Sequence, residues 1–441
     1  MNIGVKTPNN KRGGLFMSNN LGKGTVGIHG GYSPKSGEPR VLPIYQSATY
    51  KYDDPDTLEA LFSLKAEGHL YSRISNPTVG ALEEKYAKLE GGVGAVATAS
   101  GQSAILYAIL NICKAGDHII SVTSLYGGTV NLFTVHLKNL GIEVTFVDPD
   151  ASEEEILSKA KENTKAIYGE TIGNPGLNIL DFDKFASVAK KVKVPFIVDN
   201  TVATPYYCNP FEHGANVVVH STTKYSEGHA QTIGGIVVDG GNFDWTSGRF
   251  NDFETPDPSY HGIKYVESFG DAAYIVKLRV TILRDLGACM SPFNAYLTNL
   301  GLETLHLRME RHSKNALEIA QWLTTQEKVS WVNYPLLEGN KYYDLAKKYL
   351  KGGASGLLTF GVKGGIDNAK EFSRRLDIIA LAVTLGDARS CLLHPATTSH
   401  SQLNEEELLA SGVTPDLLRL SVGIEDAKDL INDISEALKA I

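Results

Sequence analysis

The sequence predicts an α/β protein with a mostly parallel sheet covered by helices on both faces, followed by a smaller C-terminal α+β domain. The first observation is a regular alternation of apolar runs with helical or turn segments. The runs are HIISVT, EVTFVD, AIYGET, PFIVDN, VVVHST and GGIVVD. The second observation is a long helical stretch at 291–325, after which shorter apolar runs alternate with helices. The 441 residues suggest an N-terminal tail and arm at 1–70, a large domain at 71–290, and a linking helix with a C-terminal domain at 291–441.

The first 90 residues are predicted to hold a tail and two helices with a polar segment between them. Residues 1–20, rich in Asn, Gly and Lys, are interpreted as a tail without chemistry. A helix is expected over 53–68, because its acidic start suits the positive end of the helix dipole. An amphipathic helix is expected over 80–90. Between them, Tyr71 and Arg73 in YSRISNPT are candidate anion donors, and an ordinary polar loop is the alternative.

A strand, a tight turn and a helix follow at 91–112, and their junction is a candidate phosphate site. Ser100, Gly101 and Gln102 stand where the helix begins. A serine cap and a glycine leave backbone N–H groups free to point at an anion. A plain capped helix is the alternative interpretation.

Polar residues follow several predicted strands, at the carboxyl ends where parallel sheets bind their ligands. They are Tyr126, Glu170, Asn174, Asp199 and the run from Ser221 to Lys224. That run offers three hydroxyls beside one amine. It suits a phosphate next to a lysine that forms a Schiff base with an aldehyde cofactor, for which pyridoxal phosphate (PLP) is the candidate. A solvated lysine in a polar loop is the alternative.

Asp199 and Tyr126 suit the ring of such a cofactor. A carboxylate beside the ring nitrogen of PLP keeps that nitrogen protonated, and a pyridinium withdraws electrons more strongly. The Tyr126 ring is expected to stack on the cofactor, and the glycines after it permit a close backbone approach. A turn aspartate before Asn200 and a core-packed tyrosine are the alternatives.

Composition and patterning disfavour several other functions. A net charge of −8 disfavours nucleic acid and anionic membranes as partners, because both attract a basic face. The chain lacks an apolar run of about 18 residues and a signal-peptide core, so we expect a cytoplasmic protein without a membrane span. The cysteines form no C-x-x-C pair, and His394 and His400 match no helix-face ligand pair, so no metal site is expected. The absence of a clean G-x-G-x-x-G disfavours an NAD-binding fold.

Taken together, the motifs resemble those of the Cys/Met-metabolism family of PLP-dependent enzymes. The matching stretches are YSRISNPT, SGQSA, SLYGGT, ETIGNP, VDNTVATPY, HSTTKYSEGH, GDARSCLLHPATTSHSQL and RLSVGIED. The resemblance implies the fold type I architecture of PLP-dependent transferases, with a seven-stranded sheet. It also implies an obligate dimer with shared active sites, usually paired into a homotetramer.

The resemblance also implies a role for each candidate cofactor residue. Lys224 would carry the cofactor as a Schiff base and shuttle protons, while Asp199 would face the pyridine nitrogen. Tyr126 would stack on the ring and assist proton transfer, and Asn174 would contact the phenolic oxygen. The residues expected to hold the phosphate are Gly101, Gln102, Ser221 and Thr223, with Tyr71 and Arg73 from the neighbouring subunit.

Arg419 would bind the α-carboxylate of the substrate through its planar fork, with Thr384 close by. The activity implied is a γ-replacement, in which O-acetyl-L-homoserine and sulfide give L-homocysteine and acetate for methionine biosynthesis. A methionine γ-lyase or a cystathionine γ-synthase shares these residues and is the alternative. A non-catalytic PLP-binding protein is a further alternative.

Several features depart from the family pattern. Glu227 and Ala230 stand near the lysine, where relatives often carry smaller or different residues, and Thr384 replaces a usual serine or asparagine. Gly128 stands where typical methionine γ-lyases have a cysteine, which disfavours a lyase. Apart from these departures, an aromatic, glycine-rich insert at 240–265 is interpreted as a long ordered loop, placed at the site entrance or at a subunit interface.

Overall fold

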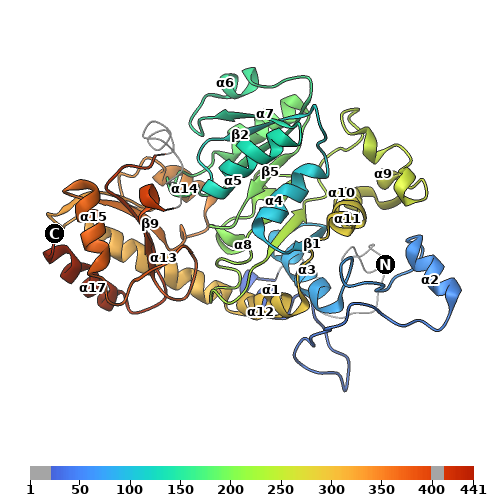
Figure 1. The fold of residues 1–441 in the computed structure, drawn as a ribbon, viewed down its shortest axis with the longest axis horizontal. Helices are drawn as coiled ribbons and strands as arrows, with labels where there is room; N and C mark the ends of the chain where they lie inside the picture. Colours follow the sequence, from blue (N-terminus) through green and yellow to red (C-terminus); the bar gives the residue numbers. More distant parts are fainter. Residues whose placement is uncertain (1–20, 399–411) are drawn as a thin grey trace.

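The computed structural model describes residues 21–398 and 412–441. The tail predicted at 1–20 and the candidate histidine His400 lie outside these residues. The described chain forms a large central sheet, a second sheet near the C-terminus on one side of it, and an N-terminal arm on the other side (Figure 1).

The central sheet has seven strands in the described chain, in the order β1-β7-β6-β5-β4-β2-β3. The strands are β1 (Gly94–Thr98), β2 (His118–Val122), β3 (Glu143–Val147), β4 (Thr164–Glu170), β5 (Phe196–Asp199), β6 (Val217–His220) and β7 (Gly235–Asp239). All neighbours pair in parallel except β7, which runs antiparallel to β1 and to β6. The predicted mostly parallel sheet is therefore confirmed.

Helices cover both faces of this sheet. The helices around the central sheet are α3 (Pro77–Glu90), α4 (Gly101–Leu110), α5 (Gly127–Asn131), α6 (Glu153–Ser158), α7 (Phe182–Val192), α8 (Thr204–Tyr207) and α10 (Ala273–Leu278). α3 packs against β1, α4 against β6 and β7, and α7 against β4 and β5. Every residue of β1, β2, β6 and β7 is buried, which requires cover on both faces.

The second sheet has five strands in the described residues, in the order β10-β11-β12-β9-β8. They are β8 (Val329–Asn333), β9 (Leu357–Val362), β10 (Ala380–Leu381), β11 (Cys391–Leu393) and β12 (Leu417–Ser421). Around them lie α13 (Leu305–Leu323), α14 (Tyr343–Tyr349), α15 (Gly365–Arg374) and α17 (Ala427–Lys439). Only β10 and β11 pair in parallel. Apolar runs in the sequence predicted four of these strands, β8, β9, β10 and β12, and missed β11.

The helical stretch expected at 291–325 consists of two helices. α12 (Pro292–Glu303) ends at Thr304, whose backbone leaves the helical region, and α13 begins at the next residue. The remaining helical segments are α1 (Lys23–His29), α2 (Pro55–Phe62), η1 (Leu132–Leu137), η2 (Pro210–His213), η3 (Asn251–Phe253), η4 (Pro258–Tyr260), α9 (Tyr265–Phe269), η5 (Gly270–Ala272), η6 (Arg279–Leu283), α11 (Arg284–Leu286) and η7 (Pro395–Thr397).

The insert at 240–265 is built around aromatic packing. Trp245 stacks on Phe253 at 4.5 Å between ring centroids and on Tyr274 of α10 at 5.2 Å. Phe250 meets the Trp245 ring edge-on at 5.2 Å. The two short turns η3 and η4 interrupt the loop, which is therefore ordered by aromatic side chains that join the core of the large domain.

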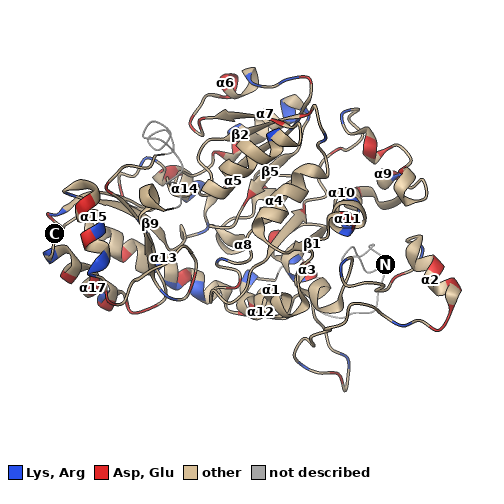
Figure 2. Cartoon of the chain, viewed as in Figure 1, with Lys and Arg blue, Asp and Glu red and all other residues tan. Residues whose placement is uncertain are grey.

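Acidic and basic residues are interspersed along the described chain (Figure 2). Within residues 21–398 and 412–441, no helix combines the length and apolarity needed to cross a membrane.

Candidate active site

The carboxyl ends of β4, β5 and β6 bring most of the predicted site residues to one edge of the central sheet. Glu170 and Asp199 are direct neighbours in the β4–β5 register, and Asp199 pairs with Val219 of β6. Lys224 follows on the turn after β6, where its backbone N–H donates to the carbonyl of Ser221. The short parallel strands therefore end together, as the sequence predicted.

The start of α4 lies against the turn that carries Lys224. Ser100 and Ser103 form a reciprocal capping box, with Ser103 N donating to Ser100 Oγ at 3.1 Å. A Cβ on Gly101 would come within 2.6 Å of the Ser221 Cβ, so only glycine allows this approach. The first N–H groups of the helix have no intrahelical acceptor and point beyond its end. Together with the Ser221 hydroxyl, they form a small anion cradle.

Two predicted phosphate contacts differ in their surroundings. Thr223 Oγ1 donates to the carbonyl of Gly234 at 3.2 Å and accepts from its N–H at 3.1 Å, so this hydroxyl already has protein partners. The side-chain oxygen of Gln102 is buried without a hydrogen-bond partner among the described residues. That atom is an acceptor and adds no donor for a phosphate, so Gln102 can contribute to a phosphate site through its backbone N–H.

Tyr126 precedes α5, and its ring lies beside Gly128. A Cβ on Gly128 would lie 2.5 Å from Cε1 of the Tyr126 ring and would also collide with Nε2 of Gln102. The departure at Gly128 is therefore explained, because the tyrosine ring and the glutamine side chain occupy the space that a larger residue needs. Tyr126 itself is 45% exposed, so one side of its ring is open to a ligand.

Asp199 lies at the end of β5 with its carboxylate held by the next turn. Its Oδ1 accepts from the N–H of Thr201 at 2.9 Å. Burial raises the pKa of Asp199, while the Thr201 hydrogen bonds and the charge of His220 act in the opposite direction. A partly buried aspartate of this kind favours a cationic partner, such as a protonated ring nitrogen.

The environment of Lys224 favours the neutral amine. Burial first, and the positive charge of Arg419 second, lower the pKa of the Lys224 ammonium. A lysine whose pKa is lowered deprotonates more readily, which suits it both to attack a carbonyl carbon and to accept a proton.

Arg419 reaches this edge from β12 in the second sheet. Its Nη1 donates to Asn174 Oδ1 at 3.1 Å, and its Nη2 donates to the main-chain carbonyl of Thr384 at 2.8 Å. Its Nε is buried and has no partner among the described residues. Arg419 as a whole is 5% exposed, so its guanidinium is fixed in place and retains donor capacity for a carboxylate. Thr384 joins the site through its backbone.

Glu227 and Ala230 shape the loop after Lys224. The buried Glu227 accepts from the N–H groups of His229 and Gln231, both at 3.1 Å. Ala230 adopts a positive φ of 56° and is exposed. Glu227 therefore caps a backbone turn.

Tyr71 and Arg73 lie on the exposed N-terminal arm. The Arg73 guanidinium sits 5.0 Å from the centroid of the Tyr71 ring. In the described chain, neither side chain forms a hydrogen bond with Gly101, Ser221 or Lys224. A single subunit does not bring this predicted pair into the cluster.

Sequence reasoning gave no role to two further residues of the site. Glu170 accepts a hydrogen bond from the backbone N–H of Tyr126 at 2.7 Å. Cys391 of β11 lies beside Arg419 and Lys224, and burial raises the pKa of its thiol. The place of Glu170 at a strand end was a usable signal, whereas the three-residue strand that carries Cys391 gave none.

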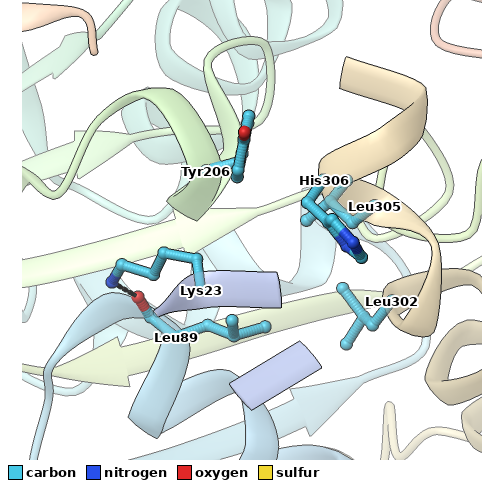
Figure 3. A pocket seen from close by; sticks show the side chains of 6 residues that line it. All are labelled: Lys23, Leu89, Tyr206, Leu302, Leu305 and His306. Atoms are coloured by element: carbon cyan, nitrogen blue, oxygen red, sulfur yellow. Dashed lines mark hydrogen bonds between the residues drawn. The ribbon is translucent and has the colours of Figure 1, made fainter. Parts of the chain in front are cut away.

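Two other features lie outside this site. A cavity of about 10 Å³, large enough for one water molecule, lies between α1 and α13 beside Lys23 and His306. There the Lys23 amine donates to the Leu89 carbonyl (Figure 3). Among the described residues, no group of His, Cys, Asp or Glu side chains is arranged to hold a metal.

The residues present fit PLP. The glycine-lined helix start and the Ser221 hydroxyl suit a phosphate, and Asp199 suits a ring nitrogen. The half-buried amine of Lys224 suits an aldehyde carbon. The unpaired Nε of Arg419 leaves a donor for a carboxylate that comes with the substrate.

Comparison with known proteins leads to the same class. Residues 24–439 match the profile of the Cys/Met metabolism PLP-dependent enzymes, and the chain belongs to this family. A Leptospira meyeri protein named O-acetyl-L-homoserine sulfhydrylase is 47% identical over 438 residues, which cover 97% of this chain and 99% of that protein. A Schizosaccharomyces pombe protein named homocysteine synthase is 45% identical over 419 residues, covering 94% and 97% of the two chains.

A solved structure extends the likeness to the fold. The putative O-acetylhomoserine (thiol)-lyase of Campylobacter jejuni superposes with a TM-score of 0.92 at 40% identity, covering 95% of this chain and all of that one. That structure carries N'-pyridoxyl-lysine-5'-monophosphate at its position 205.

Proposed function

We propose that the protein converts O-acetyl-L-homoserine and sulfide into L-homocysteine and acetate, a PLP-dependent γ-replacement. The observation that carries this proposal is the meeting of Lys224, Asp199 and Arg419, which come from two different sheets, at one edge of the central sheet. The names of the similar proteins from Leptospira meyeri and Schizosaccharomyces pombe support the choice of substrate.

In this proposal, Lys224 holds the cofactor and later moves protons. The cofactor supplies an electron sink that stabilises the negative charge left when a proton leaves the substrate. Lys224, whose pKa is lowered by burial, accepts that proton and returns it at the end of turnover. Asp199 keeps the ring nitrogen charged.

The phosphate and ring contacts follow from the same geometry. Gly101 and Gln102 donate backbone N–H groups to the phosphate, and Ser221 donates its hydroxyl. Thr223 is also a phosphate ligand in this proposal, although its hydroxyl forms a hydrogen bond with the Gly234 carbonyl in this structure. Asn174 presents its amide N–H to the phenolic oxygen, since its Oδ1 already accepts from Arg419.

Arg419 binds the α-carboxylate of O-acetylhomoserine and orients the side chain of the substrate for the exchange at Cγ. Acetate leaves from Cγ as the C–O bond breaks, and hydrosulfide forms the new C–S bond there. The Thr384 carbonyl fixes the guanidinium, and Tyr126 covers the ring and assists proton transfer.

The oligomeric state belongs to the same proposal. Tyr71 and Arg73 reach the phosphate of a neighbouring subunit, and two such dimers form a homotetramer. The exposed stacking of the two side chains supports this arrangement, because a single chain leaves their polar groups to solvent. The division into 1–70, 71–290 and 291–441 is supported by the two separate sheets.

The test is the stoichiometry of the reaction. The PLP-loaded protein is given O-acetyl-L-homoserine and sulfide, and acetate and homocysteine are quantified together. Equal amounts of both products support replacement. Acetate released without homocysteine would contradict it.

A further inference from the structure

Glu170 stands beside Asp199 at the edge of the sheet where the cofactor site is proposed, and the proposed mechanism gives it no role. The two residues are paired in the register of the parallel strands β4 and β5. Paired residues of neighbouring strands point to the same face of a sheet, and the strands lie about 4.8 Å apart. The two carboxyl groups are therefore close neighbours on the same face. Glu170 is only 5% exposed.

Glu170 also touches the segment that carries the ring-stacking tyrosine. Its Oε1 accepts the backbone N–H of Tyr126 at 2.7 Å. Tyr126 is the residue before α5, so this hydrogen bond fixes the point where the chain turns into that helix. The position of the tyrosine ring thus depends on a side chain of β4, 44 residues further along the sequence.

The charge of the pair follows from burial. Burial first, and the nearby Asp199 second, raise the pKa of Glu170 well above its ordinary value. The backbone N–H groups of Tyr126 and Asn174 offset part of this rise, and the Thr201 hydrogen bonds and the charge of His220 do the same for Asp199. Two carboxyls this close do not both ionise, and Glu170, whose pKa stays the more strongly raised of the two, keeps the proton.

We propose that Glu170 is a positioning residue: as a neutral acid it holds the Tyr126 backbone and leaves Asp199 as the charged carboxylate beside the cofactor. This inference rests on the proposed cofactor site. It does not depend on which substrate the enzyme takes.

Two variants test the hydrogen bond to Tyr126 and the neutral charge of Glu170 separately. Glu170→Gln keeps an oxygen for the Tyr126 N–H and is neutral, so it mimics the acid. Glu170→Ala leaves that N–H without a partner in a buried place. The apoproteins are titrated with PLP, and cofactor affinity and the visible circular dichroism of the bound cofactor are measured. Thermal unfolding of the apoproteins reports on the fold separately.

We expect Glu170→Gln to bind PLP within about twofold of wild type, with the same circular dichroism. Glu170→Ala should bind about tenfold more weakly with an altered spectrum, because a buried N–H is left unpaired. Wild-type affinity in Glu170→Ala would overturn the positioning role. A Glu170→Gln protein that binds at least tenfold more weakly than wild type would overturn the neutral-acid role, even if the alanine variant failed to fold.

These outcomes are distinct from a failure of the proposed function. If wild type binds PLP but forms no homocysteine, the sulfhydrylase proposal fails while the comparison of variants remains decisive. Wild type that binds no PLP would overturn both the site and this role.

Discussion

Among the predicted site residues, Arg419 is the one for which even a chemically similar amino acid is a poor substitute. Nη1 and Nη2 each give one N–H to Asn174 and to the Thr384 carbonyl, and Nε together with the second N–H of each Nη remains for the substrate. A lysine at this position keeps the charge and loses the planar fork.

Arg419→Lys is therefore expected to raise KM for O-acetylhomoserine roughly 10- to 100-fold, the equivalent of losing one or two hydrogen bonds to a charged group. KM for sulfide should stay near that of wild type. Steady-state kinetics with each substrate varied in turn measures both constants. Arg375 is an exposed arginine in the same part of the chain, and Arg375→Lys controls for any general effect of replacing an arginine by lysine. Equal increases in both KM values would argue against a carboxylate contact.

Gly128 gives a second prediction at this scale. An added methyl group would meet the Tyr126 ring and the Gln102 amide, so Gly128→Ala should weaken PLP binding about tenfold through displacement of these two groups. Gly80→Ala is the matched control, because its Cβ would meet nothing within 4 Å inside α3. That exchange should leave cofactor binding unchanged. Equilibrium titration of both apoproteins with PLP decides, and equal affinities would contradict the steric account.

At the scale of the element, β7 ends in an acid that makes stability depend on pH. Asp239 accepts backbone N–H groups from Gly241 at 2.9 Å and Ile275 at 3.3 Å. Burial raises the pKa of Asp239 to about 7, compared with roughly 3.9 in an unfolded chain. The folded protein thus binds this proton more tightly than the unfolded chain does. The contribution of Asp239 to the free energy of unfolding therefore falls as pH rises from about 4 to about 7, and levels off above.

Asp239→Asn removes this titration. We expect the Tm of the variant, relative to wild type, to increase between pH 5 and pH 8, whatever its offset at pH 5. Thermal unfolding at each pH measures the difference, and Asp344→Asn, on the exposed surface, supplies the background slope. A constant difference across the range would contradict a raised pKa.

The elements also show how far the sequence alone could lead. Alternating apolar runs predicted the central sheet, because a strand buried on both faces must be apolar throughout. The start of α3 was missed by three residues. The Asn76 side chain accepts from the N–H of Thr78 at 2.9 Å, and Pro77 opens the helix, a cap that had been interpreted as part of a loop. The helix expected at 53–68 ends at Phe62, before Leu64 adopts a positive φ.

The site residues that follow strands could be predicted from the sequence, and the other site residues less so. Lys224, Asp199 and Ser221 follow apolar runs, so their common edge could be inferred from the topology. The contact of Arg419 with Asn174 joins residues 245 apart in the sequence. Periodicity carries no information at that range; the resemblance placed both residues in the site, but it did not predict their contact. The use of the Thr384 backbone could not be inferred from residue types at all.

At the scale of the whole molecule, we propose that a neighbouring subunit completes the active site through Tyr71 and Arg73. Arg73→Ala and Lys224→Ala should each remove most activity in a pure preparation, since one lacks a phosphate ligand and the other lacks the proton carrier. Mixed dimers should regain one intact site of two, because Arg73 and Lys224 of one site come from different chains. Random mixing should then restore roughly a quarter of wild-type activity, since half of the dimers are hybrids.

The two variants are unfolded together, refolded with PLP and assayed, with each variant alone as the control. Hybrids isolated through different affinity tags confirm that mixing occurred. If such hybrids stay inactive, Arg73 acts within its own subunit or not at all.

The central claim is that this site replaces the acetyl group of O-acetylhomoserine by sulfide. The most direct measurement runs the PLP-loaded protein in two reactions, one with O-acetyl-L-homoserine and sulfide, the other with methionine and no thiol. We predict homocysteine in the first and no 2-oxobutyrate in the second. If 2-oxobutyrate forms from methionine while the first reaction gives no homocysteine, the protein is a γ-lyase and the account of its substrate is wrong.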